Sequence, residues 1–196
     1  MFANRYTAFI DACTLASALK RNLLLSLAEA EFFRVRWSAK VMEETEAAIA
    51  SILAAKGVTD ASARASRACN AMQEAFEDAE VLAYDAFLPT CSELPDHGDA
   101  HVLAAALKTR ASTIVTENLA DFPEEILAPL NIEARSADAF IADTIALDAG
   151  RAVAAIRKMR DRFDRPEKTA EQLLLDMEAA GLTETVDALR AHVLSL

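Results

Sequence analysis

Five short runs of apolar or β-branched residues occur along the first 135 residues of this chain, and helical patterns separate them. The runs cover residues 6–10, 33–37, 81–84, 112–116 and 131–134. Between them, leucines recur every three or four positions, as at Leu15, Leu19 and Leu23, which is the spacing of one helix face. Strands that alternate with helices form βαβ units, whose parallel sheet is covered by helices on both faces. The pattern predicts an α/β fold in three layers (α/β/α) with a central parallel sheet of about five strands.

The remainder of the chain carries helical patterns only. The expected helices cover residues 136–147, 150–163, 169–180 and 183–195. We therefore predict two parts, an α/β domain over residues 1–135 and a C-terminal helical extension over residues 136–196. The pattern leaves open whether the extension packs on the sheet or forms a subdomain of its own.

The composition narrows the possible classes of function. The 196 residues are 53% apolar, which is enough to build a core. With 20 Lys and Arg against 31 Asp and Glu, the formal charge of -11 argues against a protein that coats duplex DNA or an anionic membrane. The 4 glycines are far apart in the sequence, which excludes glycine-rich phosphate-binding loops.

Cysteine usage and the N-terminal residues predict where the protein acts. Cys13, Cys69 and Cys91 are odd in number and widely spaced, as expected of reduced thiols rather than of a disulfide framework. Asp11 and Lys20 interrupt the N-terminal apolar stretch, and no run approaches the roughly 18 apolar residues of a membrane-spanning helix. We predict a cytoplasmic protein without a membrane partner.

Several carboxylates follow the predicted strands or begin the helices beside them. They are Asp11, Glu43, Glu44, Asp99 and Asp121. In a parallel sheet, the crevice beyond the carboxyl ends of the strands is where ligands bind. Two like charges about 4 Å apart repel by about 4 kcal/mol at an effective dielectric near 20, so clustered carboxylates need solvent, protons or a cation. Taken singly, each also fits a helix cap or a solvated surface group.

Four stretches of the chain share the pattern of a known family. They read FIDAC, RWSAKVMEE, LPDHGDAHVLAAALKTRA and STIVTENLADFP. Together they resemble the PIN-domain family of metal-dependent nucleases, which includes the toxin ribonucleases of VapC-type toxin–antitoxin pairs. The resemblance covers residues 6–135 and is most specific over residues 99–123.

The resemblance implies both a site and a function. It assigns metal binding and catalysis to Asp11, Glu44, Asp99 and Asp121, with Mg²⁺ or Mn²⁺ as the cofactor. Thr116 and Asn118 are implied as loop-shaping polar residues, which we also expect to contact the substrate. The implied activity is that of an endoribonuclease that acts on RNA, forms a homodimer and is silenced by an antitoxin protein.

Glu44 is preferred to Glu43 because it lies six residues after Ser38, as in the serine-led helix of the family. Adjacent helical residues face about 100° apart, so only one of the two glutamates can point into the site.

Basic residues provide candidate phosphate contacts. Arg36 and Lys40 lie near the second predicted strand, and residues 151–168 hold seven Lys or Arg against three Asp or Glu. That basic segment fits a solvated amphipathic helix equally well.

Other interpretations stay open. Cys13 stands where the family usually has an Asn that braces the acidic cluster, and since a thiol is a weak hydrogen-bond partner, Thr14 is a candidate substitute. A catalytically silent PIN-like module that binds RNA or protein is therefore one alternative. A phosphatase of the haloacid-dehalogenase type is less favoured, because its second Asp would have to stand at Cys13.

The two histidines near Asp99 do not form a predicted zinc site. His97 and His101 are four residues apart, but Gly98 stands where a zinc protease has its Glu. We expect His101 to lie at the rim of the site, where it could touch the substrate.

Overall fold

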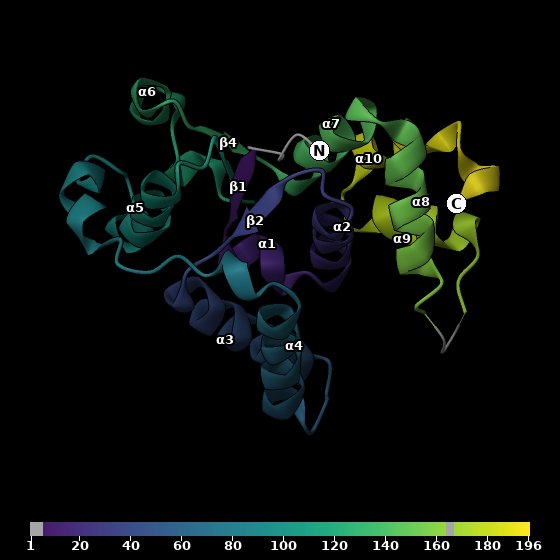
Figure 1. Ribbon diagram of the computed structural model, residues 1–196. Helices are drawn as coiled ribbons and strands as arrows, with labels where there is room; N and C mark the ends of the chain where they lie inside the picture. The colour runs from purple at the N-terminus through teal and green to yellow at the C-terminus, as the bar shows by residue number, and fades with distance from the viewer. Residues whose placement is uncertain (1–5, 164–166) are drawn as a thin grey trace.

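The computed structural model describes residues 6–163 and 167–196, with a four-stranded parallel sheet at the centre of the molecule (Figure 1). In spatial order the strands are β2 (Arg34–Arg36), β1 (Thr7–Ile10), β3 (Thr113–Val115) and β4 (Glu133–Arg135). The central strands β1 and β3 are fully buried, and Phe9 of β1 lies opposite Ile114 of β3. The predicted α/β class with a parallel sheet is confirmed.

Helices account for most of the remaining chain. The α-helices are α1 (Ala12–Ala16), α2 (Ala18–Glu29), α3 (Ala39–Ala55), α4 (Ala61–Ala75), α5 (Ala100–Thr109), α6 (Glu124–Leu127), α7 (Ala137–Leu147), α8 (Ala149–Arg160), α9 (Ala170–Ala179) and α10 (Thr183–Arg190). Shorter 3₁₀ turns are η1 (Glu77–Ala79), η2 (Asp85–Cys91), η3 (His97–Asp99), η4 (Leu119–Asp121), η5 (Ala128–Leu130) and η6 (Val193–Ser195). Residues 1–5 and 164–166, which fall within the predicted segments 1–135 and 151–168, lie outside the described residues.

Helices cover both faces of the sheet. α5 packs against β1 and β3, whereas α2 packs against β2 and α7. Figure 1 shows α5 and α2 on opposite sides of the strands. In α7, Phe140 meets Phe33 edge-on, with ring centroids 4.9 Å apart, and stacks on Tyr6. The C-terminal helices therefore pack on the α/β part of the molecule, which answers the question that the sequence left open.

The prediction of a third strand at residues 81–84 is wrong. Only Trp37 and Glu80 form an isolated parallel bridge at this point, and the Val81 N–H donates to the Trp37 carbonyl over 2.8 Å. Ala83 has a φ of 53°, in the left-handed region that a strand cannot pass through. The chain then turns into η2, so the sheet has four strands where about five were predicted.

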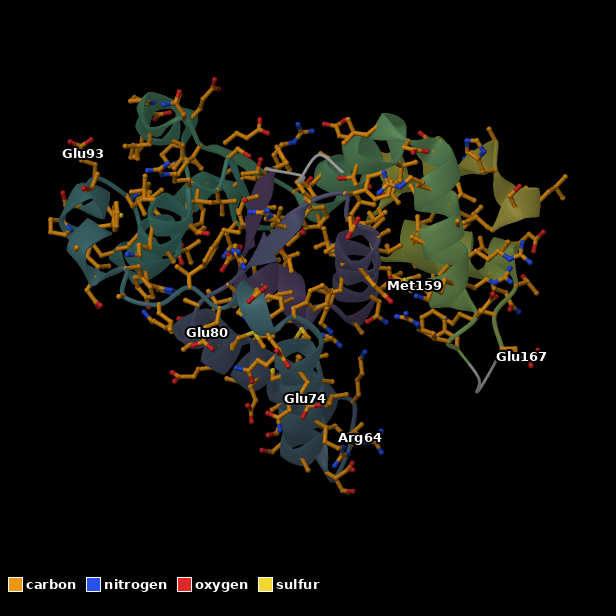
Figure 2. The ribbon with its side chains drawn as sticks, viewed as in Figure 1. Arg64, Glu74, Glu80, Glu93, Met159 and Glu167 are labelled. Atoms are coloured by element: carbon orange, nitrogen blue, oxygen red, sulfur yellow. The ribbon has the colours of Figure 1, made fainter. Side chains whose placement is uncertain are left out.

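The helix after β2 begins where the sequence indicates. Ser38 is its N-cap, and its Oγ accepts a hydrogen bond from the Val41 N–H over 3.2 Å. α3 then packs against α4, and Figure 2 shows the exposed Arg64 and Glu74 along α4, below the sheet. Among the described helices, none combines the length and the apolar character that crossing a membrane requires.

Candidate active site

Asp11 lies between β1 and α1, at the carboxyl end of a central strand, and only 5% of it is exposed. Its Oδ1 accepts a hydrogen bond from the Ala12 N–H over 2.6 Å, which caps α1. Its Oδ2 accepts from the Thr116 hydroxyl over 2.7 Å. Thr116 follows β3, the neighbour of β1, so the parallel pairing of the two strands brings these side chains together.

Cys13 belongs to the same network. Its thiol donates to Asp11 Oδ2 over 3.1 Å, and its sulfur accepts from the Glu117 N–H over 3.3 Å. Burial, and then the charge of Asp11, raise the pKa of Cys13, so the thiol keeps its proton at neutral pH. Thr14 does not take this place, because its hydroxyl reaches the Val115 carbonyl instead. Cys13 itself thus contacts the carboxylate.

Asp99 lies where η3 leads into α5, and it is half-buried. Its pKa is raised to about 6, first by burial and then by four neighbouring carboxylates, those of Asp11, Asp121, Asp96 and Glu44. These groups come from the junction of β1 and α1, from η4, from the loop before η3, and from α3. The other three predicted metal ligands therefore lie near enough to Asp99 to act on its charge.

Of the two adjacent glutamates, Glu44 is the one that faces this neighbourhood. Glu43 is exposed, whereas Glu44 is half-buried, with its Oε1 3.2 Å from His101 Nε2 and 3.8 Å from Lys40 Nζ. Burial raises the pKa of Glu44; Lys40 opposes this effect, and Asp11 and Glu43 add to it.

His101 lies deeper than predicted. Instead of standing at a rim, it is only 5% exposed and contacts Glu44 from the first turn of α5. Burial and Lys40 lower its pKa to about 4, against the effect of Asp11, so the imidazole is neutral near pH 7. Residues 102–106 after it are all buried. A helix that is apolar on all sides is a buried helix, so this run could have indicated the burial of His101.

The predicted substrate-binding residues divide into two groups, and the first lies at the carboxylates. Thr116 is buried and holds Asp11, so it shapes the site from within. Asn118 is exposed, and its backbone N–H donates to the Thr116 hydroxyl over 3.1 Å. Lys40 is exposed beside Glu44.

Arg36 forms the second group. Burial and Arg34 lower its pKa, and Asp78 opposes them, so its charged neighbours are not the predicted metal ligands. It lines a groove of about 1770 Å³ bordered by β2, η1 and α8. The described contacts therefore do not join Arg36 to the carboxylates.

Three basic residues of the predicted segment 151–168 attach α8 and the residues after it to the end of α2 and the residues that follow. Arg151 donates to the Ala30 carbonyl over 2.6 Å and lies over the Phe32 ring. Lys158 and Arg162 both pair with Glu29, at the end of α2. These contacts give the basic helix a structural role, whereas Arg165 lies outside the described residues.

The donor set has the chemistry of a site for a hard cation. Carboxylate oxygens are the ligands that Mg²⁺ and Mn²⁺ prefer. Within residues 6–163 and 167–196, however, no three His, Cys, Asp or Glu side chains are grouped closely enough to hold an ion as they stand. The ligand types therefore fit a divalent metal, while their spacing is wider than that of a formed metal centre.

Comparison with known proteins places this arrangement in a family. Residues 7–120, more than half of the chain, match the PIN domain family, and residues 137–191 match the VapC50 C-terminal domain family. A curated relative from Mycobacterium tuberculosis, "Putative ribonuclease VapC50", is 42% identical over 76 residues. That alignment covers 39% of this chain and 45% of the relative, so it spans less than half of the relative's length. No solved structure matches significantly.

The fold, the acidic neighbourhood and the PIN match lead to one assignment. A parallel sheet brings Asp11 next to Thr116, and carboxylates from α3, η3 and η4 lie around them. The chain therefore belongs to the PIN-domain family.

Proposed function

We propose that this protein is a Mg²⁺- or Mn²⁺-dependent endoribonuclease in which Asp11, Glu44, Asp99 and Asp121 bind the metal and orient the attacking water. The observation that carries the proposal is the placement of Asp11 at the carboxyl end of β1, where the Thr116 hydroxyl donates to its Oδ2 over 2.7 Å. Asp99 lies near enough that burial, and then the charges of Asp11, Asp121, Asp96 and Glu44, raise its pKa. Carboxylates that share a partly buried region repel one another without a counter-ion. A divalent cation would relieve the repulsion and draw the ligands closer together.

The residues of the site would have different roles in the proposed reaction. A divalent metal would activate water and stabilise the leaving oxygen of the phosphodiester. Thr116 and Cys13 hold Asp11 Oδ2, so this carboxylate is oriented before the substrate arrives. Lys40, exposed beside Glu44, is the basic side chain best placed to meet an RNA phosphate. In-line hydrolysis would leave 5′-phosphate and 3′-hydroxyl ends.

The partners belong to the same proposal. The name of the curated relative supports RNA as the substrate class. The match of the C-terminal helices to a VapC50 family supports a toxin of a toxin–antitoxin pair, silenced by an antitoxin protein. We further propose that the protein acts in the cytoplasm as a homodimer.

Cleavage of a fluorescently labelled, structured RNA tests the proposed activity. Wild type with millimolar Mn²⁺ should cut the RNA, and Asp11→Asn and Asp99→Asn should each lose at least about 100-fold in rate, because each removes a ligand and its charge. Glu43→Gln is the matched control, since Glu43 is exposed, and it should cleave like wild type. Metal-independent cleavage, or equal loss in all three variants, would contradict the proposal.

A second function is favoured by the wide spacing of the carboxylates. Since no three potential ligands among the described residues form a closed group, a PIN-like module that binds RNA or protein without cutting is the alternative. RNA binding without cleavage, at every divalent metal tested, would establish it. The phosphatase interpretation lacks this support, because the chain matches the PIN domain family.

A further inference from the structure

His101 is the buried side chain whose position the proposed function does not yet explain. Among the described residues, its Nδ1 is the one buried side-chain nitrogen or oxygen without a hydrogen-bond partner. Its other ring nitrogen, Nε2, lies 3.2 Å from Glu44 Oε1. One imidazole nitrogen therefore meets a carboxylate, and the other meets no polar group.

This asymmetry decides where the ring proton lies. A buried N–H without an acceptor is rarer and more unfavourable than an acceptor without a donor. A proton on Nδ1 would be such an N–H, and it would leave two lone pairs facing each other between Nε2 and Glu44. With the proton on Nε2, the N–H instead lies on the side of the ring that meets Glu44 Oε1, at an N···O distance of 3.2 Å.

We propose that His101 is a positioning residue, whose Nε2 contact with Glu44 Oε1 restrains this carboxylate and leaves Oε2 free for a divalent metal. Both described contacts of the Glu44 carboxylate, from His101 and from Lys40, are made to Oε1. His101 is anchored in the buried first turn of α5, only two residues after Asp99, so it ties the α3 carboxylate to the helix that carries another ligand. The inference rests on the proposed function, because Glu44 is there a metal ligand.

Removing a group that orients a metal ligand typically weakens metal binding by about 10- to 100-fold. The packing of α3 and α5 alone does not fix the glutamate, since its side chain has three rotatable bonds. The contact with His101 restricts that freedom before a metal binds.

NMR of the metal-free protein tests the position of the ring proton, which the proposed contact with Glu44 requires on Nε2. The chain has 3 histidines, so the His101 signals can be assigned by their loss in His101→Asn. Long-range proton–nitrogen spectra at pH 7 should show a protonated Nε2 and an unprotonated Nδ1. A protonated Nδ1 would overturn the inference, whether or not the protein cleaves RNA.

A matched pair of variants tests the effect on the metal. The amide nitrogen of Gln is as far from Cβ as His Nε2, whereas that of Asn is only as far as Nδ1. His101→Gln should keep the donor to Glu44 and bind Mn²⁺ almost as wild type does, whereas His101→Asn should bind it about 10- to 100-fold more weakly. Calorimetric titration of the full chain with Mn²⁺ measures both, and His97→Asn, at an exposed position, is the control.

The outcomes separate this inference from the proposed function. Equal weakening in His101→Gln and His101→Asn would show that only the ring shape matters, and it would overturn the positioning role. Wild type that binds no Mn²⁺ would instead overturn the metal-dependent function, while the NMR spectra still show whether Nε2 carries the proton that the contact with Glu44 requires.

Discussion

Asp11 is oriented by its neighbours before any ligand binds. One oxygen caps α1, and the other accepts from both the Thr116 hydroxyl and the Cys13 thiol. A carboxylate with several donors keeps its orientation, and a fixed orientation lowers the entropy lost on metal binding. The thiol is the weakest of these donors. Its contribution can be measured by replacing its sulfur with oxygen, as in serine.

Cys13→Ala should reduce metal affinity and Cys13→Ser should not. Alanine removes a hydrogen bond to a metal ligand, which typically weakens metal binding by about 10-fold or more. A serine hydroxyl is a stronger donor than a thiol and reaches the same oxygen. Mn²⁺ titration of the three proteins checks this, and equal affinity in all three would show that Thr116 and the Ala12 N–H orient Asp11 without the thiol.

Asp99→Asn should stabilise the metal-free protein at pH 7. The pKa of Asp99 rises from 3.8 to about 6 on folding, so the folded state binds the extra proton and stability falls as the pH rises through this window. The full shift would correspond to about 3 kcal/mol, which partial exposure reduces to about 1 kcal/mol. Urea denaturation should show this gain at pH 7 and none at pH 3.5.

Millimolar Mn²⁺ supplies the control for Asp99→Asn. The metal should stabilise wild type more than the variant, because the variant lacks one ligand. A variant that is less stable than wild type at pH 7 without metal would contradict the predicted repulsion.

The residues of the site differ in how far the sequence predicts them. The structure brings Asp11, Glu44, Asp99 and Asp121 into one electrostatic neighbourhood, as the family pattern implies, although their metal-binding role stays a prediction. The contact between His101 and Glu44 could not be predicted in this way. It depends on how closely α3 and α5 approach, which no local pattern encodes.

At the scale of single elements, the helix start at Ser38 and four of the five short strands were predictable from the sequence, and the strand predicted at 81–84 was not. Ser38 begins α3 because its side chain satisfies the Val41 N–H, a signal contained within four residues. Residues 81–84 have a strand-like composition but no neighbouring strand to pair with over their length. The left-handed Ala83 then ends the extended stretch after a single bridge. Strand formation depends on a partner that is remote in sequence, which explains the error.

Asp138→Ala should destabilise the C-terminal helices by about 1–2 kcal/mol. Asp138 on α7 accepts from the N–H groups of Glu184 and Thr185 over 3.0 and 2.8 Å, and so caps α10 from another helix. Burial acts to raise the pKa of Asp138, but the hydrogen bonds from Thr185 and Glu184 outweigh it, so the pKa is lowered. Hydrogen exchange should show faster opening of α10.

The pH dependence of this effect has a definite sign. Because folding lowers the pKa of Asp138, the ionised carboxylate stabilises the fold at pH values above the ordinary pKa of 3.8. This stabilisation is lost as the pH falls below that value, so the variant and wild type should become equally stable in acid. Asp143 lies on the same helix as Asp138, is exposed, and pairs with Arg135 of β4. Asp143→Ala should change stability by less than about 1 kcal/mol. An Asp138→Ala protein as stable as Asp143→Ala would contradict the capping role.

At the scale of the whole molecule, the C-terminal helices pack directly on the α/β part of the chain. The predicted division at residue 135 stays a prediction, and the family matches at residues 7–120 and 137–191 leave the strand β4 between them. α7 nevertheless packs its Phe140 against Phe33 and Tyr6 beside the sheet. Cooperative unfolding of the two parts follows from this shared core.

Phe140→Ala should therefore weaken the entire protein. The side chain is 3% exposed, and replacing a buried Phe by Ala typically costs about 3–5 kcal/mol. Thermal unfolding followed by both circular dichroism and tryptophan fluorescence should shift in one transition, since Trp37 reports on the α/β part. Leu194→Ala, at a side chain that is 98% exposed, is the control and should change stability by less than about 0.5 kcal/mol. Two separate transitions would contradict a shared core.

The two outer strands have a consequence for how copies of this chain can associate. β2 and β4 are each three residues long and carry charged side chains, Arg34 and Arg36 on one and Glu133 and Arg135 on the other. Short, charged outer strands resist pairing with a strand from another molecule. Concentrated protein should therefore resist sheet-mediated aggregation, and we expect a stable association between copies to avoid the edges of the sheet.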